Sequence, residues 1–518
     1  MPTQPPNIIF IMADQLAASF VGCYGSGVES TPTLDSLAAR GVRFDRSYAH
    51  VPVCAPNRAS IFTGRNAEAH GIVTNNLILQ PDAPTFGHIM QRQGYRTGGF
   101  GKFHLTPMMR PLPEDFSYLG FDESVPTEDP KLGPWLDWVE REHPDYYEHA
   151  LAVSWSMGYV TEYGPDKRDI KSAMAAANEK HVRPRREASQ WGLMYPSPLP
   201  AELHQTTYIT DLSLDFIHRH RRDNPDQPFF LHTSYVDPHD PYDPPAPYDT
   251  MFDPADMPPP IPAAWTERGS WTHDNSLDFP GWREVCDDVD AVKQLRAYFH
   301  GSIRFIDDQI KRITDHLDSE GLWDDTIVVF TTDHGDMMGD HRLITKGTKH
   351  YDTGIRVPHI ACGTGIDHAI SDRLTTSLDH LPTFCDWAGV GARPPLDGRS
   401  VAPVCAGESG ETWDEIAVQW TGHPHEGCVR SIITDDGWRL SIFSEEGYGE
   451  MFNLREDPTE QRNLYFDAES TAKRQELHER LTRTYMRQSD THQYRNLPEI
   501  DGKKHVMGKG FGPLEETW

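Results

Sequence analysis

Cysteine is scarce in this chain, and its cysteines are never closely paired. Seven cysteines occur in 518 residues, and no two of them form a CxxC motif. An odd number of scattered cysteines favours neither a disulfide framework nor a structural zinc site. We therefore expect most of them to be ordinary buried thiols.

Positive charge and long apolar runs are also in short supply. The 48 lysines and arginines face 78 aspartates and glutamates, and the formal net charge of −30 argues against general binding of nucleic-acid phosphates. No apolar run approaches the roughly 20 residues of a membrane span. The opening NIIFIMAD (7–14) is too short for a secretory signal and lacks its basic start. The sequence thus predicts a globular, cytoplasmic protein with no nucleic-acid or membrane partner.

What the chain does have is three apolar runs, each followed by acids or histidines. The runs cover residues 7–13, 229–234 and 326–331. The polar residues just beyond them are Asp14, Asp237, His239, Asp333 and His334. Continuous apolar runs of this length are typical of strands buried in a parallel sheet. Ligands of such sheets gather beyond the carboxyl ends of the strands, so the three segments predict one active site.

A helical pattern separates the last two runs. Apolar residues recur at spacings of four and three from Phe299 to Leu317, and the pattern ends near Gly321. Strand, helix and strand in succession are typical of the α/β class. The fold class predicted from the sequence is therefore α/β.

Composition divides the chain into parts. Residues 1–401 form the predicted catalytic domain, interrupted at about 107–200 by an insertion rich in proline, acids and aromatics. Residues 402–490 predict a small domain, with a hairpin turning at 435–437 and an amphipathic helix. Residues 491–518 lack periodicity and predict either a disordered tail or an arm on a partner subunit, hence a possible homo-oligomer. The insertion's aromatics either contact a substrate or form its core.

The strand-end residues include a set of hard metal ligands. Asp14, Asp333 and His334 suit Ca²⁺, Mg²⁺ or Mn²⁺ better than a thiolate-bound zinc. The plainer alternative is that they are loop and capping residues, because a strand-end DHG is common by chance. His239 in DPHDPY has the same alternative as a loop histidine.

Two further segments carry candidate anion ligands. In GFGKFHLT, glycines adjoin Lys102 and His104, which suits a close approach to an anion. Lys346 lies near enough in sequence to Asp333 to return to the same pocket. The alternatives are a solvated turn and an ordinary surface lysine.

Cys54, Pro56 and Arg58 form a C-x-P-x-R motif, which resembles the signature of the sulfatase family. Further blocks follow in the family's order: NIIFIMADQ, CAPNRASIFTGR, GYRTGGFGKFHL, PHDPY, TTDHGDMMGDH and YDTGIRVP. The resemblance runs from Asn7 to about Tyr465. It implies the alkaline-phosphatase-like fold, a large mixed, mostly parallel sheet flanked by helices, with a smaller C-terminal α+β domain.

The resemblance also implies a nucleophile and a metal. Cys54 would be oxidised by a formylglycine-generating enzyme to formylglycine, whose hydrate attacks sulfur. Asp14, Asp333, His334 and the modified residue 54 would hold one divalent cation, usually calcium. Gln15 departs from the pattern, since many family members have a second aspartate there, although a carboxamide oxygen still coordinates Ca²⁺.

The remaining family positions surround the substrate sulfate. Arg58 would orient the formylglycine hydrate, and His239 would protonate the leaving oxygen, with Lys346 as the second choice. The residues implied to hold sulfate oxygens are Asn75, Lys102, His104, His239 and Lys346. Asn76 is the neighbouring alternative to Asn75.

These inferences predict a sulfuric ester hydrolase that acts on a small sulfate ester, with aryl, choline and carbohydrate sulfates all open. One alternative is a phosphonate monoester hydrolase or phosphodiesterase, a related family that shares the C-x-P-x-R cysteine and the Asp-Gln start. Those hydrolases carry tyrosine and threonine where this chain has Lys102 and His104, so the pair favours the sulfatase. The other alternative is a catalytically silent binder of sulfated ligands.

Overall fold

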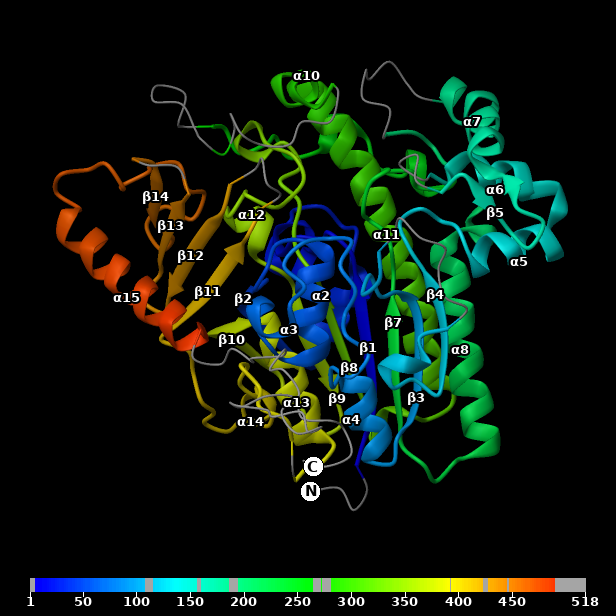
Figure 1. Ribbon diagram of the computed structural model, residues 1–518, viewed down its shortest axis with the longest axis horizontal. Coiled ribbons are helices and arrows are strands. Elements are labelled where there is room, and N and C mark those ends of the chain that lie inside the picture. The colour runs from blue at the N-terminus through cyan, green and yellow to red at the C-terminus, as the bar shows by residue number, and fades with distance from the viewer. Residues whose placement is uncertain are drawn as a thin grey trace, which may run out of the picture.

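The protein is described here from a computed structural model (Figure 1). The structure describes all residues except 1–4, 108–114, 156–159, 186–193, 264–271, 273–280, 392, 423–426, 445–446 and 490–518. Residues 491–518, predicted as either a disordered tail or an arm on a partner subunit, therefore lie outside the described residues. Within the described ranges, no helix is both long and apolar enough to cross a bilayer.

The first apolar run forms the middle of a large sheet. This strand, β1 (Asn7–Ala13), lies in an eight-stranded sheet of order β10-β2-β9-β8-β1-β7-β3-β4. The other strands are β2 (Val42–Tyr48), β3 (Arg96–Lys102), β4 (Glu123–Thr127), β7 (Phe229–Ser234), β8 (Thr326–Thr332), β9 (His359–Gly363) and β10 (Ala369–Thr376). Only β9 runs antiparallel to its neighbours in this sheet. The predicted α/β class and the three buried strands are confirmed.

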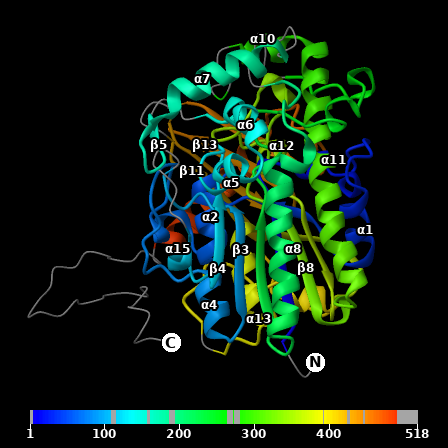
Figure 2. The ribbon, with the colours of Figure 1, turned by 90° about the vertical axis from the view of Figure 1, so that its right-hand side faces the viewer.

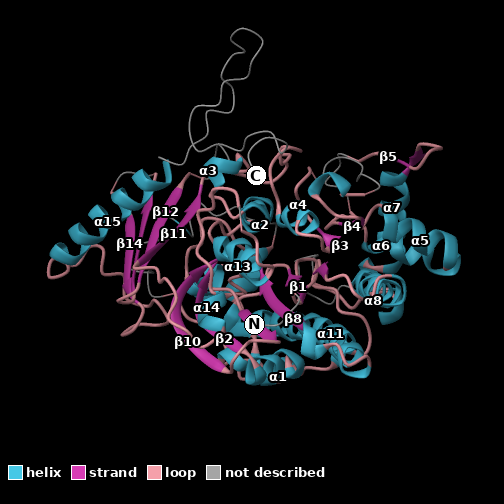
Figure 3. Cartoon of the chain, turned by 90° about the horizontal axis from the view of Figure 1, so that it is seen from below, coloured by secondary structure: helices cyan, strands magenta, loops and turns pink. Residues whose placement is uncertain are grey.

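Alternate residues of β1 face two different helical layers, because side chains alternate across a strand. Ile9 and Ile11 pack with α1 (Pro32–Arg40), α8 (Gln205–Asp223) and α11 (Val289–Ser319). The intervening residues pack with α2 (Cys54–Thr63), α4 (Phe86–Arg92) and α13 (His380–Trp387). Figure 3 shows the sheet between these two layers, and Figure 2 shows α8 beside α11. The helix predicted to end near Gly321 is α11.

Residues 107–200, predicted as an insertion, also supply a strand of the main sheet. β4 pairs in parallel with β3 and forms the sheet edge. The insertion's helices are α5 (Pro134–Glu142), α6 (Tyr147–Val153) and α7 (Ile170–His181), with a two-stranded sheet of β5 (Glu162–Tyr163) and β6 (Arg168–Asp169). Trp135 is buried in their shared core and donates from Nε1 to the Leu203 carbonyl at 3.0 Å. This aromatic is therefore a core residue.

A second, antiparallel sheet follows on the opposite side of the molecule from α5–α7 (Figure 1). Its strands are β11 (Glu415–Trp420), β12 (Val429–Thr434), β13 (Trp438–Phe443) and β14 (Gly449–Asn453), in sequence order. The turn between β12 and β13 covers residues 435–437, as predicted. The amphipathic helix α15 (Thr471–Ser489) packs Leu477 and Leu481 on this sheet. The short helices are α3 (Ala67–His70), α10 (Trp282–Asp287), α12 (Asp352–Ile355) and α14 (Ala402–Cys405).

Candidate active site

Two neighbouring strands deliver the first carboxylates. β1 pairs in parallel with β8, with Ala13 opposite Thr332, so Asp14 and Asp333 leave the sheet at the same edge. His334 follows directly, and all three polar side chains are fully buried. Burial without compensation would be costly, so partners must surround these carboxylates.

Cys54 opens a helix whose ten residues are all buried. Its Sγ lies 3.1 Å from His334 Nε2 and 3.9 Å from Asp14 Oδ1. The first turn of a helix carries a partial positive charge, which favours an anion at this position. The residue that the signature singles out is therefore held at the centre of the strand-end cluster.

The ligand atoms of Asp14, Cys54, Asp333 and His334 all lie within 4.8 Å of one another. His334 Nε2 is 3.9 Å from Asp14 Oδ1 and 3.8 Å from Asp333 Oδ1. Ligand atoms at 2.3–2.6 Å from Ca²⁺ stand about 3.3–3.7 Å apart at right angles and farther apart at wider angles, so these spacings fit such an ion. His334 Nδ1 faces the Gly335 carbonyl at 3.0 Å, which leaves the Nε2 lone pair for a metal. The donor set thus fits a hard divalent cation.

Arg58, one helical turn after Cys54, ties the carboxylates together. Its Nε donates to Asp333 Oδ2 at 2.7 Å and its Nη2 to Asp14 Oδ2 at 3.0 Å. Nη1 donates to the Lys102 carbonyl at 2.7 Å and to Ser234 Oγ at 2.9 Å. These contacts fix the guanidinium rigidly, and its charge compensates the buried carboxylates.

Gln15 links the candidate metal ligand Asp333 to Lys346. Its Oε1 accepts a hydrogen bond from Lys346 Nζ, and its Nε2 donates to Asp336 Oδ2 at 2.6 Å. Its backbone N–H donates to Asp333 Oδ1 at 3.1 Å. The ammonium and the carboxylate together fix which end of the amide is oxygen. The backbone at Gln15 has φ 64°, a conformation that L-residues adopt at a cost and that clusters at functional sites.

Lys102 ends β3 and projects into the same cluster. Its Nζ lies 2.6 Å from Asp14 Oδ2 and also pairs with Asp129. Burial lowers the pKa of Lys102, but Asp129 and Asp14 outweigh it and raise the pKa well above its usual value. Burial, followed by Lys102, lowers the pKa of His104 well below its usual value. Neither ring nitrogen of His104 has a hydrogen-bond partner among the described residues, so this buried imidazole is free to bind a ligand.

His239 and Lys346 contact each other beside Gln15. Lys346 Nζ lies 2.6 Å from His239 Nε2, while His239 Nδ1 faces the Asp240 carbonyl at 2.7 Å. Burial and Lys346 lower the pKa of His239, but Asp240 and Asp129 outweigh them and raise it to about 9. The pair therefore keeps a proton available at neutral pH, as a general acid requires.

A family model described as Sulfatase matches residues 6–390. The chain belongs to the sulfatase family. A second model, described as N-sulphoglucosamine sulphohydrolase, C-terminal, matches residues 339–487 of this sulfatase. The predicted class, a sulfuric ester hydrolase of the alkaline phosphatase superfamily, is confirmed.

Named relatives span nearly the whole sulfatase. An arylsulfatase from Clostridium perfringens is 29% identical over 465 residues, covering 89% of this chain and 90% of that protein. A choline-sulfatase from Rhizobium meliloti is 26% identical over 474 residues, covering 90% of this chain and 83% of that protein. The structure of a phosphonate monoester hydrolase from Silicibacter pomeroyi superposes with a TM-score of 0.71 at 25% identity, covering 93% of this chain and 96% of that one.

The structure brings the predicted site residues of this sulfatase into one cluster. Asn75 belongs to it through Oδ1, which accepts the Ala55 N–H at 3.1 Å beside Cys54. Asn76 also has its Oδ1 buried, without a partner among the described residues. Sequence reasoning missed three acids that contact the cluster: Asp129, Asp240 and Asp336. The last two stand inside the PHDPY and DHGD motifs, which could have indicated them, whereas Asp129 lies in no motif.

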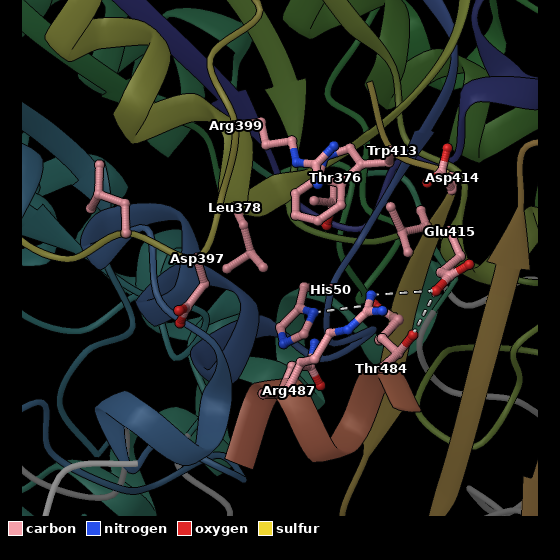
Figure 4. A pocket seen from close by; sticks show the side chains of 14 residues that line it. His50, Thr376, Leu378, Asp397, Arg399, Trp413, Asp414, Glu415, Thr484 and Arg487 are labelled. Carbon is pink, nitrogen blue, oxygen red and sulfur yellow. Dashed lines mark hydrogen bonds and ion pairs between the residues drawn. The ribbon is translucent and has the colours of Figure 1, made fainter. Parts of the chain in front are cut away.

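A separate pocket lies between the large sheet and the C-terminal sheet (Figure 4). Arg399 stacks on Trp413 at 4.0 Å, and Glu415 lies 3.9 Å from Arg487. His50 also lines it. None of the predicted site residues is among the described residues that line this pocket, so it is distinct from the candidate active site.

Proposed function

We propose that this sulfatase hydrolyses sulfate monoesters to an alcohol or phenol and inorganic sulfate, using formylglycine at position 54 and one divalent ion, most favourably Ca²⁺. The observation that carries the proposal is the placement of Cys54. It begins a buried helix and faces His334 and Asp14 within 4 Å. A formylglycine-generating enzyme would be the partner in maturation.

Asp14, Asp333 and His334 would hold the cation, together with residue 54. When bound, the ion would act as a Lewis acid that stabilises negative charge beside residue 54. Residue 54, once converted to hydrated formylglycine, would supply one hydroxyl to attack sulfur and a second whose deprotonation would later expel sulfate and restore the aldehyde. An ordinary serine or cysteine would lack this internal route and would need a separate attack by water.

The chain's own cations bind and orient the substrate. Arg58 is held in place by four hydrogen bonds and sets the orientation of residue 54. Lys102, His104 and Asn75 face the sulfate oxygens, where negative charge must be stabilised without solvent reorganisation.

The leaving oxygen gains negative charge as the S–O bond breaks and must be protonated. His239, paired with Lys346 at 2.6 Å, is the proton donor in this proposal. Lys346 adds positive charge at the same point, which also favours departure of an alkoxide or phenoxide.

Hydrolysis of phosphonate monoesters or phosphodiesters is the second candidate. The similarity to a solved phosphonate monoester hydrolase and the Asp-Gln start favour it. Lys102 and His104 favour sulfate, because they form the pair that resembles the sulfatase type. We therefore assign the phosphorus esters to side activity.

The proposal is tested by mass spectrometry of the Cys54 peptide after expression with the maturing enzyme, beside an assay on an aryl sulfate. We expect a loss of about 18 Da at Cys54, as oxidation of the thiol to an aldehyde requires. Cys54→Ala should abolish sulfate release. Cys23→Ala is the matched control, because Cys23 is half-buried and lies outside the metal-ligand cluster. An unmodified thiol with undiminished activity of Cys54→Ala would overturn the mechanism.

A further inference from the structure

Lys102 is compensated by more negative charge than one ion pair supplies. Its Nζ contacts Asp14 Oδ2 at 2.6 Å and also contacts Asp129 Oδ1. All three side chains are almost fully buried, with exposed fractions of 0% for Lys102, 0% for Asp14 and 2% for Asp129. Since Asp14 is already paired with Arg58 and placed to bind the cation, Asp129 is the carboxylate that remains to offset the charge of Lys102.

Asp129 reaches this position from the edge of the sheet. It follows the carboxyl end of β4, just as Lys102 ends the neighbouring β3. Burial raises the pKa of Asp129, but Lys102 and then His239 outweigh it and hold the pKa below its usual value. Asp129 is therefore a carboxylate at neutral pH, close to two groups that face the substrate anion.

A fixed carboxylate next to an anion-binding lysine affects how favourably substrates of different net charge bind. A sulfate monoester carries one negative charge. A phosphate monoester carries close to two above its second pKa of about 6, whereas a phosphodiester carries one. In a buried site, one additional unit of substrate charge beside a carboxylate costs much more than in water.

We infer that Asp129 is a specificity-determining residue that selects monoanionic tetrahedral esters over dianionic ones by offsetting the charge of Lys102. The inference rests on the proposed function and deepens it, because it defines the accepted substrate class by net charge. Asp129 does not touch the reacting atoms in this scheme. It acts through Lys102 and is thus a positioning residue.

The test compares three 4-nitrophenyl substrates at pH 8 with matured wild-type protein and Asp129→Asn. These are the sulfate monoester, the phosphate monoester and the bis(4-nitrophenyl) phosphodiester. For Asp129→Asn, we expect the kcat/KM ratio of phosphate monoester to sulfate monoester to rise about tenfold or more. The ratio of phosphodiester to sulfate should stay within about twofold, since both are monoanions.

Glu128→Gln is the matched control at the neighbouring position. Glu128 Oε1 accepts the backbone N–H groups of Phe103 and His104 at 3.2 and 2.7 Å. Burial raises the pKa of Glu128 to about 8, so its replacement by glutamine changes little charge near neutral pH. At pH 7 this variant should leave the phosphate-to-sulfate ratio unchanged, and Asp129→Asn should already raise it.

Asp129→Ser provides a second neutral side chain if Asp129→Asn does not fold. An unchanged monoester ratio in a folded neutral variant would overturn the inference, as would an equal rise for the phosphodiester. Absence of sulfate hydrolysis by the matured wild-type protein would instead overturn the proposed function.

Discussion

Replacement of Gln15 by glutamate tests whether the Gln15 amide has the orientation described above, with its nitrogen towards Asp336 and its oxygen towards Lys346. The change is nearly isosteric, but it places a carboxylate oxygen where Nε2 now donates to Asp336 Oδ2 at 2.6 Å. Asp240 Oδ1 lies 3.3 Å from the same atom. The other oxygen keeps the contact with Lys346. The variant should therefore create a close pair of buried carboxylates.

The magnitude follows from the distance. Two unit charges 2.6 Å apart repel by about 6 kcal/mol at an effective dielectric constant of about 20. The new carboxyl would instead take up a proton, which costs about 4 kcal/mol at pH 7 and about 1 kcal/mol at pH 5 for a group with an ordinary pKa of about 4.3. Attraction to Lys346 makes these values upper limits. Because the folded-state pKa is raised, the loss of stability grows as the pH rises above the unfolded value.

Urea unfolding of the metal-free protein at pH 5 and pH 7 measures this effect. We expect Gln15→Glu to lower the unfolding midpoint clearly at pH 7 and only slightly at pH 5. The double variant Gln15→Glu/Asp336→Asn should recover most of the loss at pH 7, because an amide donor then faces the new carboxylate. A loss that is equal at both pH values, or that Asp336→Asn does not relieve, would refute the assigned amide orientation.

Three further predictions concern the backbone, the buried histidines and the metal. Gly101 has φ 107°, and an added Cβ would lie 1.8 Å from the Ser234 carbonyl oxygen. Gly101→Ala should therefore abolish folding or displace Lys102, as soluble yield and melting temperature will show. Gly94→Ala is its control, with φ 91° but nothing within 4 Å, and should cost only about 1 kcal/mol; equal effects would contradict the clash. Burial lowers the pKa of four histidines to about 3, namely His232, His300, His341 and His380. These histidines stay neutral in the folded protein but take up a proton on unfolding below the unfolded pKa of about 6.5. The free energy of unfolding should therefore fall by about 2 kcal/mol per histidine from pH 7 to pH 5, as urea unfolding will show. His380→Phe should remove its share, and an unchanged pH dependence would contradict this. Chelation of the divalent ion should abolish sulfatase activity and lower the melting temperature, and Ca²⁺ at one hundred times its Kd should restore about 2.7 kcal/mol; a chelator without effect on either would argue against the metal site.

The sequence alone predicted the parts of the site that regular patterns produce. Asp14, Asp333 and His334 follow apolar runs, and the carboxyl ends of neighbouring parallel strands must lie together. Cys54 and Arg58 come from a short signature whose spacing is one helical turn. In each case a regular element, a strand or a helix, can be recognised from the sequence and also places the residue in the site.

Other features depend on packing between distant segments and carry no such pattern. β4 reads ESVPT, a short edge strand with three polar residues and a proline, so no apolar run marked it within the predicted insertion. Asp129 follows it in a loop without periodicity, and its contact with Lys102 exists only because β4 pairs with β3. The amide orientation of Gln15 likewise depends on Asp336 and Lys346, more than 300 residues away in sequence.

The complete burial of α2 has a consequence for the order of events during synthesis. Once the protein is folded, Cys54 is 1% exposed, and no residue of its helix is open to another enzyme. The contact that encloses it involves His334, which is 280 positions further along the chain. At about 5–20 residues per second, ribosomes need roughly 15–60 s to reach that point. Conversion of Cys54 by a second protein would therefore have to take place in this interval, so that maturation competes with folding in time.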